Sequence, residues 1–233
     1  LKEYELHLRG LGFLNTINPF FDYFEKITPI DDISDIKKFN SNTTLYLIRN
    51  NSDHLIAQNK YSFKLEKIWG TIITNTNEIR INRNTSRNIK KAEKNLSFHL
   101  INNLNDLKGY HNGLRIYRKQ MGFGTAGFNE YKKILNNKFY KAFILKEEQK
   151  IVAGLGIINN DYYASEINSF SFLPYANDYL KYKILSYCKD NHILYYDFAG
   201  CNPNPRPGSK DDGIKKYKEK WGGNYYNVYI LKK

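Results

Sequence analysis

A set of four cations recurs with helical spacing in the segment of residues 86–94: Arg87, Lys90, Lys91 and Lys94. Positions i, i+3, i+4 and i+7 share one face of a helix, so the four charges point the same way. The apolar residues of the segment fall on the other side, where they can pack on a core. Such a face suits a diphosphate or an RNA backbone. The same pattern is also typical of an ordinary solvated helix, and the charges alone leave both interpretations open.

A second candidate site lies where a predicted strand, residues 193–198, runs into a proline-rich loop. Tyr196 and Asp197 end the strand, Gly200 follows, and Arg206 stands between the prolines at 205 and 207. Proline fixes φ, so such a loop is stiff without a core of its own. A stiff loop at a strand end can hold a ligand, although a structural turn has the same composition. Asp197 either positions a substrate amine or caps a neighbouring backbone group.

The third candidate segment is a basic helix near the C-terminus, residues 213–220, followed by Trp221 and two glycines. Its candidate residues are Lys215, Tyr217 and Lys218. Residues 205–233 carry a net charge of +5 within a chain of +13, so the charge is clustered at two places. A field of this sign concentrates phosphate-bearing partners. We therefore expect an anionic ligand.

These three segments, in this order, resemble the Fem-type aminoacyltransferases that build peptidoglycan cross-bridges. Residues 87–92 look like the Arg-x-Ile-x-Lys-Ala helix of that family, and residues 196–200 look like its Tyr-Asp-x-x-Gly strand end. Residues 217–223 are similar to its Phe-Lys-x-x-Phe-Gly-Gly element, with Tyr217 and Trp221 replacing the two phenylalanines. The resemblance covers about residues 65–233 and implies a GNAT-like acyltransferase fold.

The resemblance also implies roles. Lys218 matches the family's lysine near the reacting acyl group, where a cation stabilises the oxyanion that forms as an amine attacks an ester. Asp197 is the second predicted catalytic residue. Lys218 as a solvent-facing helix lysine is the alternative. The predicted substrate-binding residues are Arg87, Lys90, Lys91, Tyr196, Gly200, Arg206, Lys215, Tyr217 and Trp221.

The donor is inferred from the junction at residues 172–179. Acetyl-CoA enzymes of the GNAT type cradle a pyrophosphate in a glycine-rich turn there. This junction has no glycine, and Asp178 near the first turn of the next helix favours capping over phosphate binding. We therefore predict an acyltransferase that moves an aminoacyl group from aminoacyl-tRNA to an amine on a phosphate-bearing, cell-wall-precursor-like acceptor, without a cofactor. Two alternatives stay open: an acyl-CoA-dependent N-acyltransferase acting on a nucleotide-activated amino sugar in surface polysaccharide synthesis, and a non-catalytic RNA-binding module.

Hydrophobic periodicity and turn residues predict the elements that must position these side chains. The order is α+β, with a mixed sheet flanked by helices in residues 76–233. Residues 1–75 form a small α/β unit, which the resemblance marks as a reduced first GNAT-like half. The predicted helices are 19–26, 31–39, 86–94, 104–120, 128–136, 177–190 and 213–220. The predicted strands are 43–48, 54–58, 96–101, 139–146, 151–158, 162–170, 193–198 and 225–231.

Composition excludes several other classes of protein. The two cysteines, Cys188 and Cys201, are too few for a disulfide framework, and the five histidines are scattered without zinc-site spacing. We expect reduced thiols and no metal. Cys201 has no neighbouring histidine, which disfavours covalent catalysis. No apolar run is long enough to span a bilayer, and residues 1–9 do not read as a secretion signal. We therefore expect a cytoplasmic protein.

Overall fold

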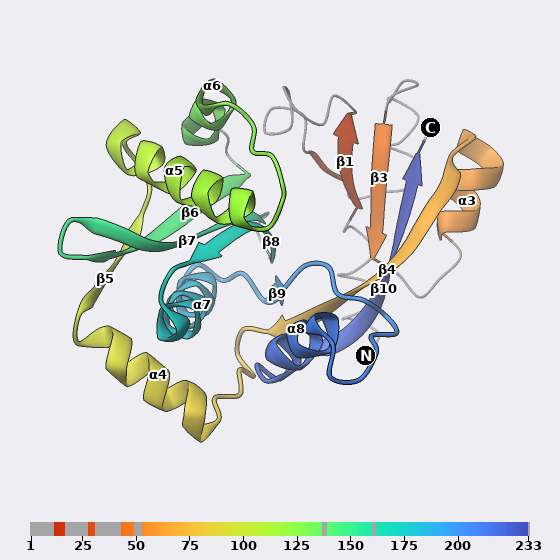
Figure 1. Ribbon diagram of the computed structural model, residues 1–233. Helices are drawn as coiled ribbons and strands as arrows, with labels where there is room; N and C mark the ends of the chain where they lie inside the picture. The colour runs from red at the N-terminus through yellow and green to blue at the C-terminus, as the bar shows by residue number, and fades with distance from the viewer. Residues whose placement is uncertain are drawn as a thin grey trace. The chain divides into compact units, whose positions relative to one another are not determined.

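The computed structural model describes residues 12–16, 28–30, 43–48, 53–136, 139–159 and 162–232. Two compact units divide these residues (Figure 1). The first unit contains the described residues up to Ile72, together with Gly200–Lys218 and residues 224–232. The second contains Ile73–Ala199 and Glu219–Gly223. The domain boundary expected after residue 75 stays a prediction.

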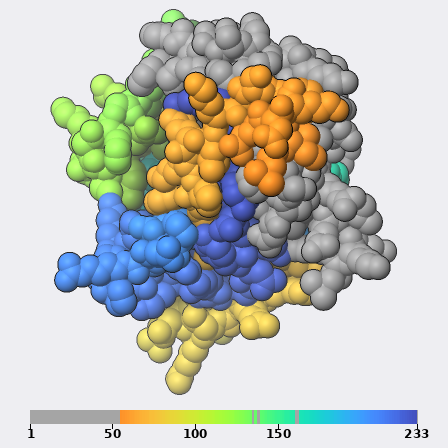
Figure 2. Space-filling model, turned by 90° about the vertical axis from the view of Figure 1, so that its right-hand side faces the viewer, coloured from red at the N-terminus to blue at the C-terminus, as the bar shows by residue number. Residues whose placement is uncertain are grey.

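In its described residues, the first unit consists of a sheet and two helices. Its strands are β1 (Gly12–Thr16), β2 (Thr28–Ile30), β3 (Thr43–Ile48), β10 (Asn224–Lys232) and the first part of β4 (Lys64–Asn75), in the order β2-β1-β3-β10-β4. The pairs β1–β2, β1–β3 and β3–β10 are antiparallel. Its helices are α3 (Asp53–Tyr61) and α8 (Lys210–Glu219), the latter ending in the second unit. In Figure 2 the blue C-terminal segment of this unit lies beside the orange segment that includes β4.

The second unit is a mixed sheet between two layers of helices. Its strand order is β4-β9-β8-β7-β6-β5, from the end of β4 through β9 (Tyr195–Asp197), β8 (Tyr163–Ser171), β7 (Lys150–Asn159) and β6 (Tyr140–Glu147) to β5 (Leu96–Leu100). Only β8 and β9 pair in parallel within this sheet. One face carries α5 (Leu104–Gln120) with α6 (Phe128–Lys132) and the 3-10 helix η2 (Lys133–Asn136), and the other carries α7 (Pro174–Asp190) (Figure 1). Helix α4 (Arg83–Glu93) packs on α7.

The core of this unit explains its layers. Apolar side chains of α7 recur at helical spacing and are fully buried at Leu180, Ile184, Leu185 and Cys188. The facing strand β7 is buried over nearly all its length, as expected for a strand that is covered on both faces. Two helices begin at asparagine caps, since the Asn82 side chain accepts from the Thr85 amide and that of Asn103 from the Asp106 amide.

The two parallel strands stay together only briefly. Strand β8 pairs with β9 over three residues, from Tyr163 to Ser165, and then continues to Ser171 beside β7 alone. A bulge at Ile167 interrupts the β7–β8 register. Because the bulge adds a residue, Glu166 and Asn168 turn to opposite faces of the sheet: Glu166 bonds Lys181 of α7, whereas Asn168 accepts from Arg118 of α5. Bulges are frequent next to active sites.

The predicted α+β architecture, a mixed sheet flanked by helices, is confirmed. The strand at 43–48 and the helix at 104–120 have the predicted bounds, and the other elements between residue 83 and the C-terminus are present with shifted ends. The strand predicted at 54–58 is wrong, because those residues form α3. Ala57 is buried on that helix, and Ser62 ends it with a left-handed φ of 60°. Strands β1, β2 and β4 were not predicted. The helices predicted at 19–26 and 31–39 lie outside the described residues.

Candidate active site

The strand end at Asp197 is a buried hydrogen-bonded centre in the second unit. The Asp197 side chain is only 3% exposed and accepts from the Tyr163 hydroxyl at 2.5 Å, the Ser165 hydroxyl at 3.3 Å and the Ala199 amide at 2.7 Å. The bond with the Ala199 amide is a cap of a neighbouring backbone group, one of the two roles that the sequence allowed for Asp197. Ala199 has a φ of 56°, a conformation that is costly for a residue with a Cβ. Asp197 therefore holds a strained turn directly after β9.

Tyr196 points away from Asp197 into a second buried polar group. Its hydroxyl donates to Glu166 at 2.8 Å, and Glu166 also forms an ion pair with Lys181 of α7. The Lys181 and Glu166 side chains are 5% and 9% exposed. This network joins β8, β9 and α7 at the point where the two parallel strands separate.

The turn continues into the first unit at Gly200. The Lys218 ammonium of α8 donates to the Gly200 carbonyl at 2.7 Å. Gly200 itself lies against an indole, since a Cβ at this position would stand 2.5 Å from Nε1 of Trp69. Cys201 then exchanges two backbone hydrogen bonds with Gly70 of β4. Only glycine fits this close approach, which fixes the carbonyl that receives Lys218.

The basic face of α4 is exposed as the sequence indicates, because Arg87, Lys90 and Lys91 all face solvent. Lys91 also lies over the Tyr175 ring, 4.6 Å from its centroid. On the inner side of α4, Asn88 donates to Asp178 of α7 at 2.8 Å. Together these contacts present the cations while the helix is held to α7.

Asp178 does not cap α7, and this corrects the interpretation of the 172–179 junction. The helix begins at Pro174, and its N-cap residue, Leu173, makes no side-chain cap bond. Asp178 lies one turn further on and is only 4% exposed. Its carboxylate accepts a hydrogen bond from the Asn88 side-chain amide and forms an ion pair of 2.5 Å with the Lys220 ammonium. The carboxylate thus ties the C-terminal motif to α4 and α7.

Trp221 is fully buried in the second unit. Its ring stacks with that of Phe198 at 6.4 Å, and its carbonyl accepts from the Arg80 amide at 3.1 Å. Gly222 follows with a φ of 91°, where a side chain would be strained. Within the described part of the chain the indole Nε1 has no hydrogen-bond partner. The aromatic and glycine positions of the C-terminal motif therefore have a packing role.

The remaining predicted residues belong to the loop and helix of the first unit. Arg206 is exposed, Tyr217 is half-buried, and Lys215 lies over the Tyr225 ring at 5.2 Å. Side chains brace the proline-rich loop: Asn202 donates to Asp211 at 2.9 Å, and the Gly208 amide donates to Asp212 at 2.8 Å. These bonds fix the loop that leads from Gly200 to α8.

Within each unit the structure brings only some of the predicted residues together, and Arg87, Lys90, Lys91 and Arg206 stand apart on exposed surfaces. In the second unit, the rings of Tyr196 and Trp221 both contact the ring of Phe198, the residue after β9. Asn88 of the basic motif and Lys220 both bond the carboxylate of Asp178. In the first unit, Lys218 contacts Gly200. Sequence reasoning missed Glu166 and Lys181, and it did not connect Asp178 with Lys220. For Lys181 the available signal was a charged residue between the apolar positions Leu180 and Ile184 of α7.

Within the described ranges, no cluster of three or more His, Cys, Asp or Glu side chains could hold a metal ion. No helix in the part of the chain that the structure describes is long and apolar enough to cross a membrane.

No family model matches the sequence, and no curated protein matches it either. Several solved structures are similar in fold. L-PGS from Bacillus licheniformis is 15% identical with a TM-score of 0.60, over 80% of this chain and 67% of that chain. FemX is 14% identical with a TM-score of 0.58, over 78% of this chain and 69% of that chain. These structures and this chain share their fold.

A third similar structure is the C-terminal domain of a protein assigned as a lysylphosphatidylglycerol synthetase from Agrobacterium fabrum. It is 12% identical with a TM-score of 0.56, and the match covers 71% of this chain and 61% of that one. At these identities the likeness shows the fold. The Fem-type resemblance that three short motifs indicated is thereby confirmed at the level of structure.

Proposed function

We propose that this protein is an acyltransferase that moves an aminoacyl group from aminoacyl-tRNA to an amine on a phosphate-bearing acceptor. The observation that carries the proposal is the bond from Lys218 to the Gly200 carbonyl, 2.7 Å long. It fixes a cation beside the end of the Tyr-Asp-x-x-Gly motif, although the two residues are 18 positions apart. The fold is shared with FemX and with L-PGS, and a lysylphosphatidylglycerol synthetase is by name an enzyme that joins an aminoacyl group to a phosphate-bearing molecule.

The proposed chemistry is a direct transfer. The acceptor amine attacks the ester carbonyl of the aminoacyl-tRNA, and its electron pair forms the new C–N bond. The carbonyl oxygen becomes an oxyanion, which the Lys218 ammonium stabilises through its positive charge. When the C–O ester bond breaks, the terminal ribose oxygen of the tRNA leaves with a proton, and the amine nitrogen loses one. Atoms and charges balance without a cofactor or a metal.

Asp197 has a positioning role in this proposal. Its hydrogen bonds with Tyr163, Ser165 and the Ala199 amide hold the backbone directly after β9. Asp197 therefore fixes the backbone at the end of β9 in the second unit.

The exposed cations of α4 hold phosphate groups in this proposal. Arg87, Lys90 and Lys91 face solvent on one side of a helix whose other side is anchored by Asn88. Neutralising a nucleic-acid backbone with several cations releases counterions, so binding depends strongly on salt. Since aminoacyl-tRNA is the donor, we place the reaction in the cytoplasm.

The decisive experiment replaces Lys218. We would measure transfer of a radiolabelled amino acid from charged tRNA to an amine acceptor for the parent protein, Lys218→Met and Lys218→Arg. Loss of one oxyanion-stabilising group lowers kcat by about 10²- to 10³-fold, and Lys218→Arg should retain part of the rate because it keeps the charge. The control is Lys216→Met on the same helix, whose side chain is 71% exposed and pairs with Asp212.

Two results would change the assignment. If Lys218→Met keeps its rate within about twofold, Lys218 is not the catalytic cation. If charged tRNA binds but no acceptor amine receives the amino acid, the RNA-binding alternative is favoured. Transfer from an acyl-CoA in place of tRNA would favour the acyl-CoA alternative.

A further inference from the structure

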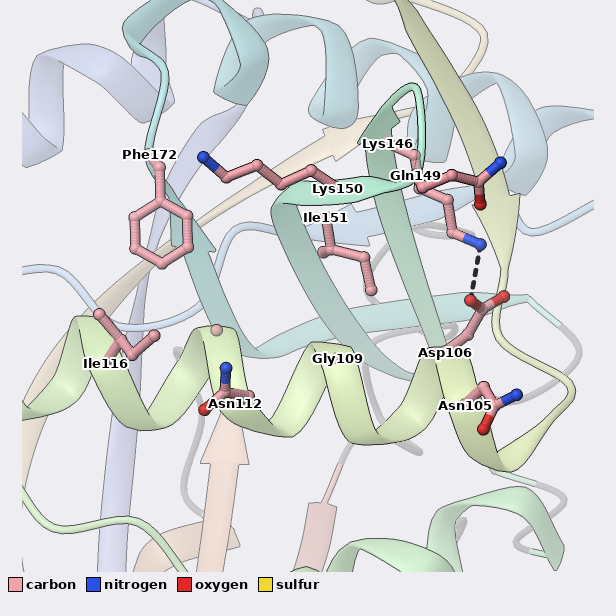
Figure 3. A pocket seen from close by; sticks show the side chains of 11 residues that line it. Asn105, Asp106, Gly109, Asn112, Ile116, Lys146, Gln149, Lys150, Ile151 and Phe172 are labelled. Atoms are coloured by element: carbon pink, nitrogen blue, oxygen red, sulfur yellow. Dashed lines mark ion pairs between the residues drawn. The ribbon is translucent and has the colours of Figure 1, made fainter.

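A pocket of about 450 Å³ opens on the second unit between α5 and the hairpin that joins β6 to β7 (Figure 3). Residues of one face of α5 line one wall, and residues 146 and 149–151 of the hairpin line the other. Phe172, directly after β8, lies at one end. None of the residues predicted for acyl transfer lines this pocket.

One end of the pocket is polar, and the two opposite charges there are paired with each other. Asp106 of α5 and Lys146 of β6 form an ion pair of 2.6 Å (Figure 3). Burial raises the pKa of Asp106, but hydrogen bonds from Lys146 and Asn103 outweigh it and hold this pKa below its usual value. The carboxylate therefore stays charged and keeps Lys146 occupied.

A second cation in the pocket has no such partner. Lys150 is exposed and forms no ion pair with any residue in the described ranges. Figure 3 shows its side chain extending along the pocket toward Phe172, opposite the Asn112 amide on α5. An ammonium and an amide that face one space can together receive a single anionic group.

The other end of the pocket is apolar and open to solvent. Ile116 and Phe172 are 41% and 38% exposed and lie at the same end in Figure 3. The chain beyond α5 continues this character, since Met121 is 38% exposed and Phe123 is 63% exposed. Ile116 and Phe172 line the same pocket, and exposed apolar side chains that lie together mark a binding surface more often than single ones do.

We propose that this pocket binds an amphiphile with an anionic head group and an apolar chain. The head group contacts Lys150 and Asn112, and the chain runs over Ile116 and Phe172 toward the exposed residues after α5. The charge of α5 favours an anionic head group, because its solvent face carries Lys108, Arg115 and Lys119 and no exposed carboxylate; the exposed Glu147 and Glu148 lie at the hairpin turn. Such a field attracts anions before they reach the pocket.

Octanoate is the probe that tests the site, because it has one carboxylate and one short chain. We would titrate it into the ¹⁵N-labelled full chain and follow amide shifts. We expect saturable shifts at residues 109–116, 149–151 and 172, with acetate and octan-1-ol each binding at least about tenfold more weakly. Lys150→Gln should lower the affinity for octanoate by about fivefold or more and leave the affinity for octan-1-ol unchanged. A fivefold loss corresponds to roughly one kilocalorie per mole, as expected for one charge contact.

The control variant is Lys189→Gln, an exposed lysine at the end of α7. It should bind octanoate like the parent protein. Shifts that spread over the surface without saturation, or equal octanoate affinity in Lys150→Gln and the parent, would overturn the proposal.

A vesicle arm distinguishes a free amphiphile from a bilayer lipid as the source. We would sediment the protein with vesicles of phosphatidylglycerol and phosphatidylcholine in equal parts, and with phosphatidylcholine alone. A membrane lipid is the source if anionic vesicles bind the parent protein but not Phe123→Ser, while both proteins bind octanoate with the same affinity. Saturable octanoate binding without vesicle binding identifies a soluble amphiphile.

Discussion

Replacement of Lys181 by methionine tests whether the buried ion pair with Glu166 holds the candidate site together. Lys181 lies on α7, Glu166 on β8, and the Tyr196 hydroxyl of β9 donates to the same carboxylate at 2.8 Å. Strands β8 and β9 share only three residue pairs, so this network is a main link between them. Methionine keeps most of the lysine stem, and the substitution therefore removes charge with little change of volume.

The magnitude follows from burial. With side chains 5% and 9% exposed, neither charge is well solvated. Removing one partner of a buried pair costs about 3–5 kcal/mol, because it leaves the other charge uncompensated. Glu166 keeps the bond from Tyr196, so we expect the lower end, about 3 kcal/mol. For a chain of this size that corresponds to a fall in Tm of roughly 6–12 °C.

The assay is urea unfolding followed by circular dichroism for the parent, Lys181→Met, Glu166→Gln and the double variant. We expect the double variant to be more stable than Lys181→Met by about 2 kcal/mol, because the stranded charge has been removed. Lys183→Met is the control: this lysine is also on α7 but half-buried, 5.8 Å from the Phe98 ring, and should cost less than about 1 kcal/mol. Aminoacyl transfer by Lys181→Met should fall at temperatures where the variant remains folded.

Two outcomes would refute this reasoning. Lys181→Met could be as stable as the parent within about 0.5 kcal/mol, or the double variant could be no more stable than Lys181→Met. The first would show that water reaches the pair in solution. The second would show that the loss came from packing of the lysine stem and not from the unpaired carboxylate.

Three further predictions concern the strand-end turn, the basic helix and a buried thiol. Gly200→Ala should destabilise the protein by about 1–3 kcal/mol and lower transfer, because the new methyl group would meet the indole at 2.5 Å, whereas Gly124→Ala, with open space around it, should be neutral. Lys90→Gln with Lys91→Gln should reduce the slope of log affinity for tRNA against log salt by about 2, measured by filter binding, and an unchanged slope would exclude a phosphate contact. Burial raises the pKa of the Cys188 thiol to about 12, so a thiol reagent at pH 8 should modify it only after unfolding, and rapid labelling of the native protein would contradict this.

Local sequence patterns predicted the second unit well because its elements have clear signals. The α5 segment begins with an asparagine cap and keeps helical periodicity to its end, and its bounds were predicted without error. The hairpin strands β6 and β7 are nearly continuous apolar runs between turn residues. In these elements the local preference and the tertiary environment agree.

Strand β4 was missed because its two halves have different environments. Residues 64–68 are all exposed and mix charged with apolar side chains, so they show no alternation. Residues 70–74 are all buried. A strand that changes from an exposed to a fully buried environment has no single period, and a pattern search reads its first half as a loop. The α3 segment was assigned to the wrong class for a related reason, since a run of five residues fits either period.

The candidate site depends on residues whose importance no local pattern reveals. Lys181 and Lys183 are two positions apart in the same helix, and only the fold decides that the first is buried against Glu166 while the second lies near a ring at the edge. Asp178 was assigned to a helix cap on sequence grounds, yet it joins Asn88 and Lys220, which are 90 and 42 positions away. Burying charges is unfavourable unless each has a partner, and a partner that distant is defined by topology. The motifs that could be recognised contain the groups proposed to meet substrate, and these buried pairs, which hold the motifs in place, could be found only in three dimensions.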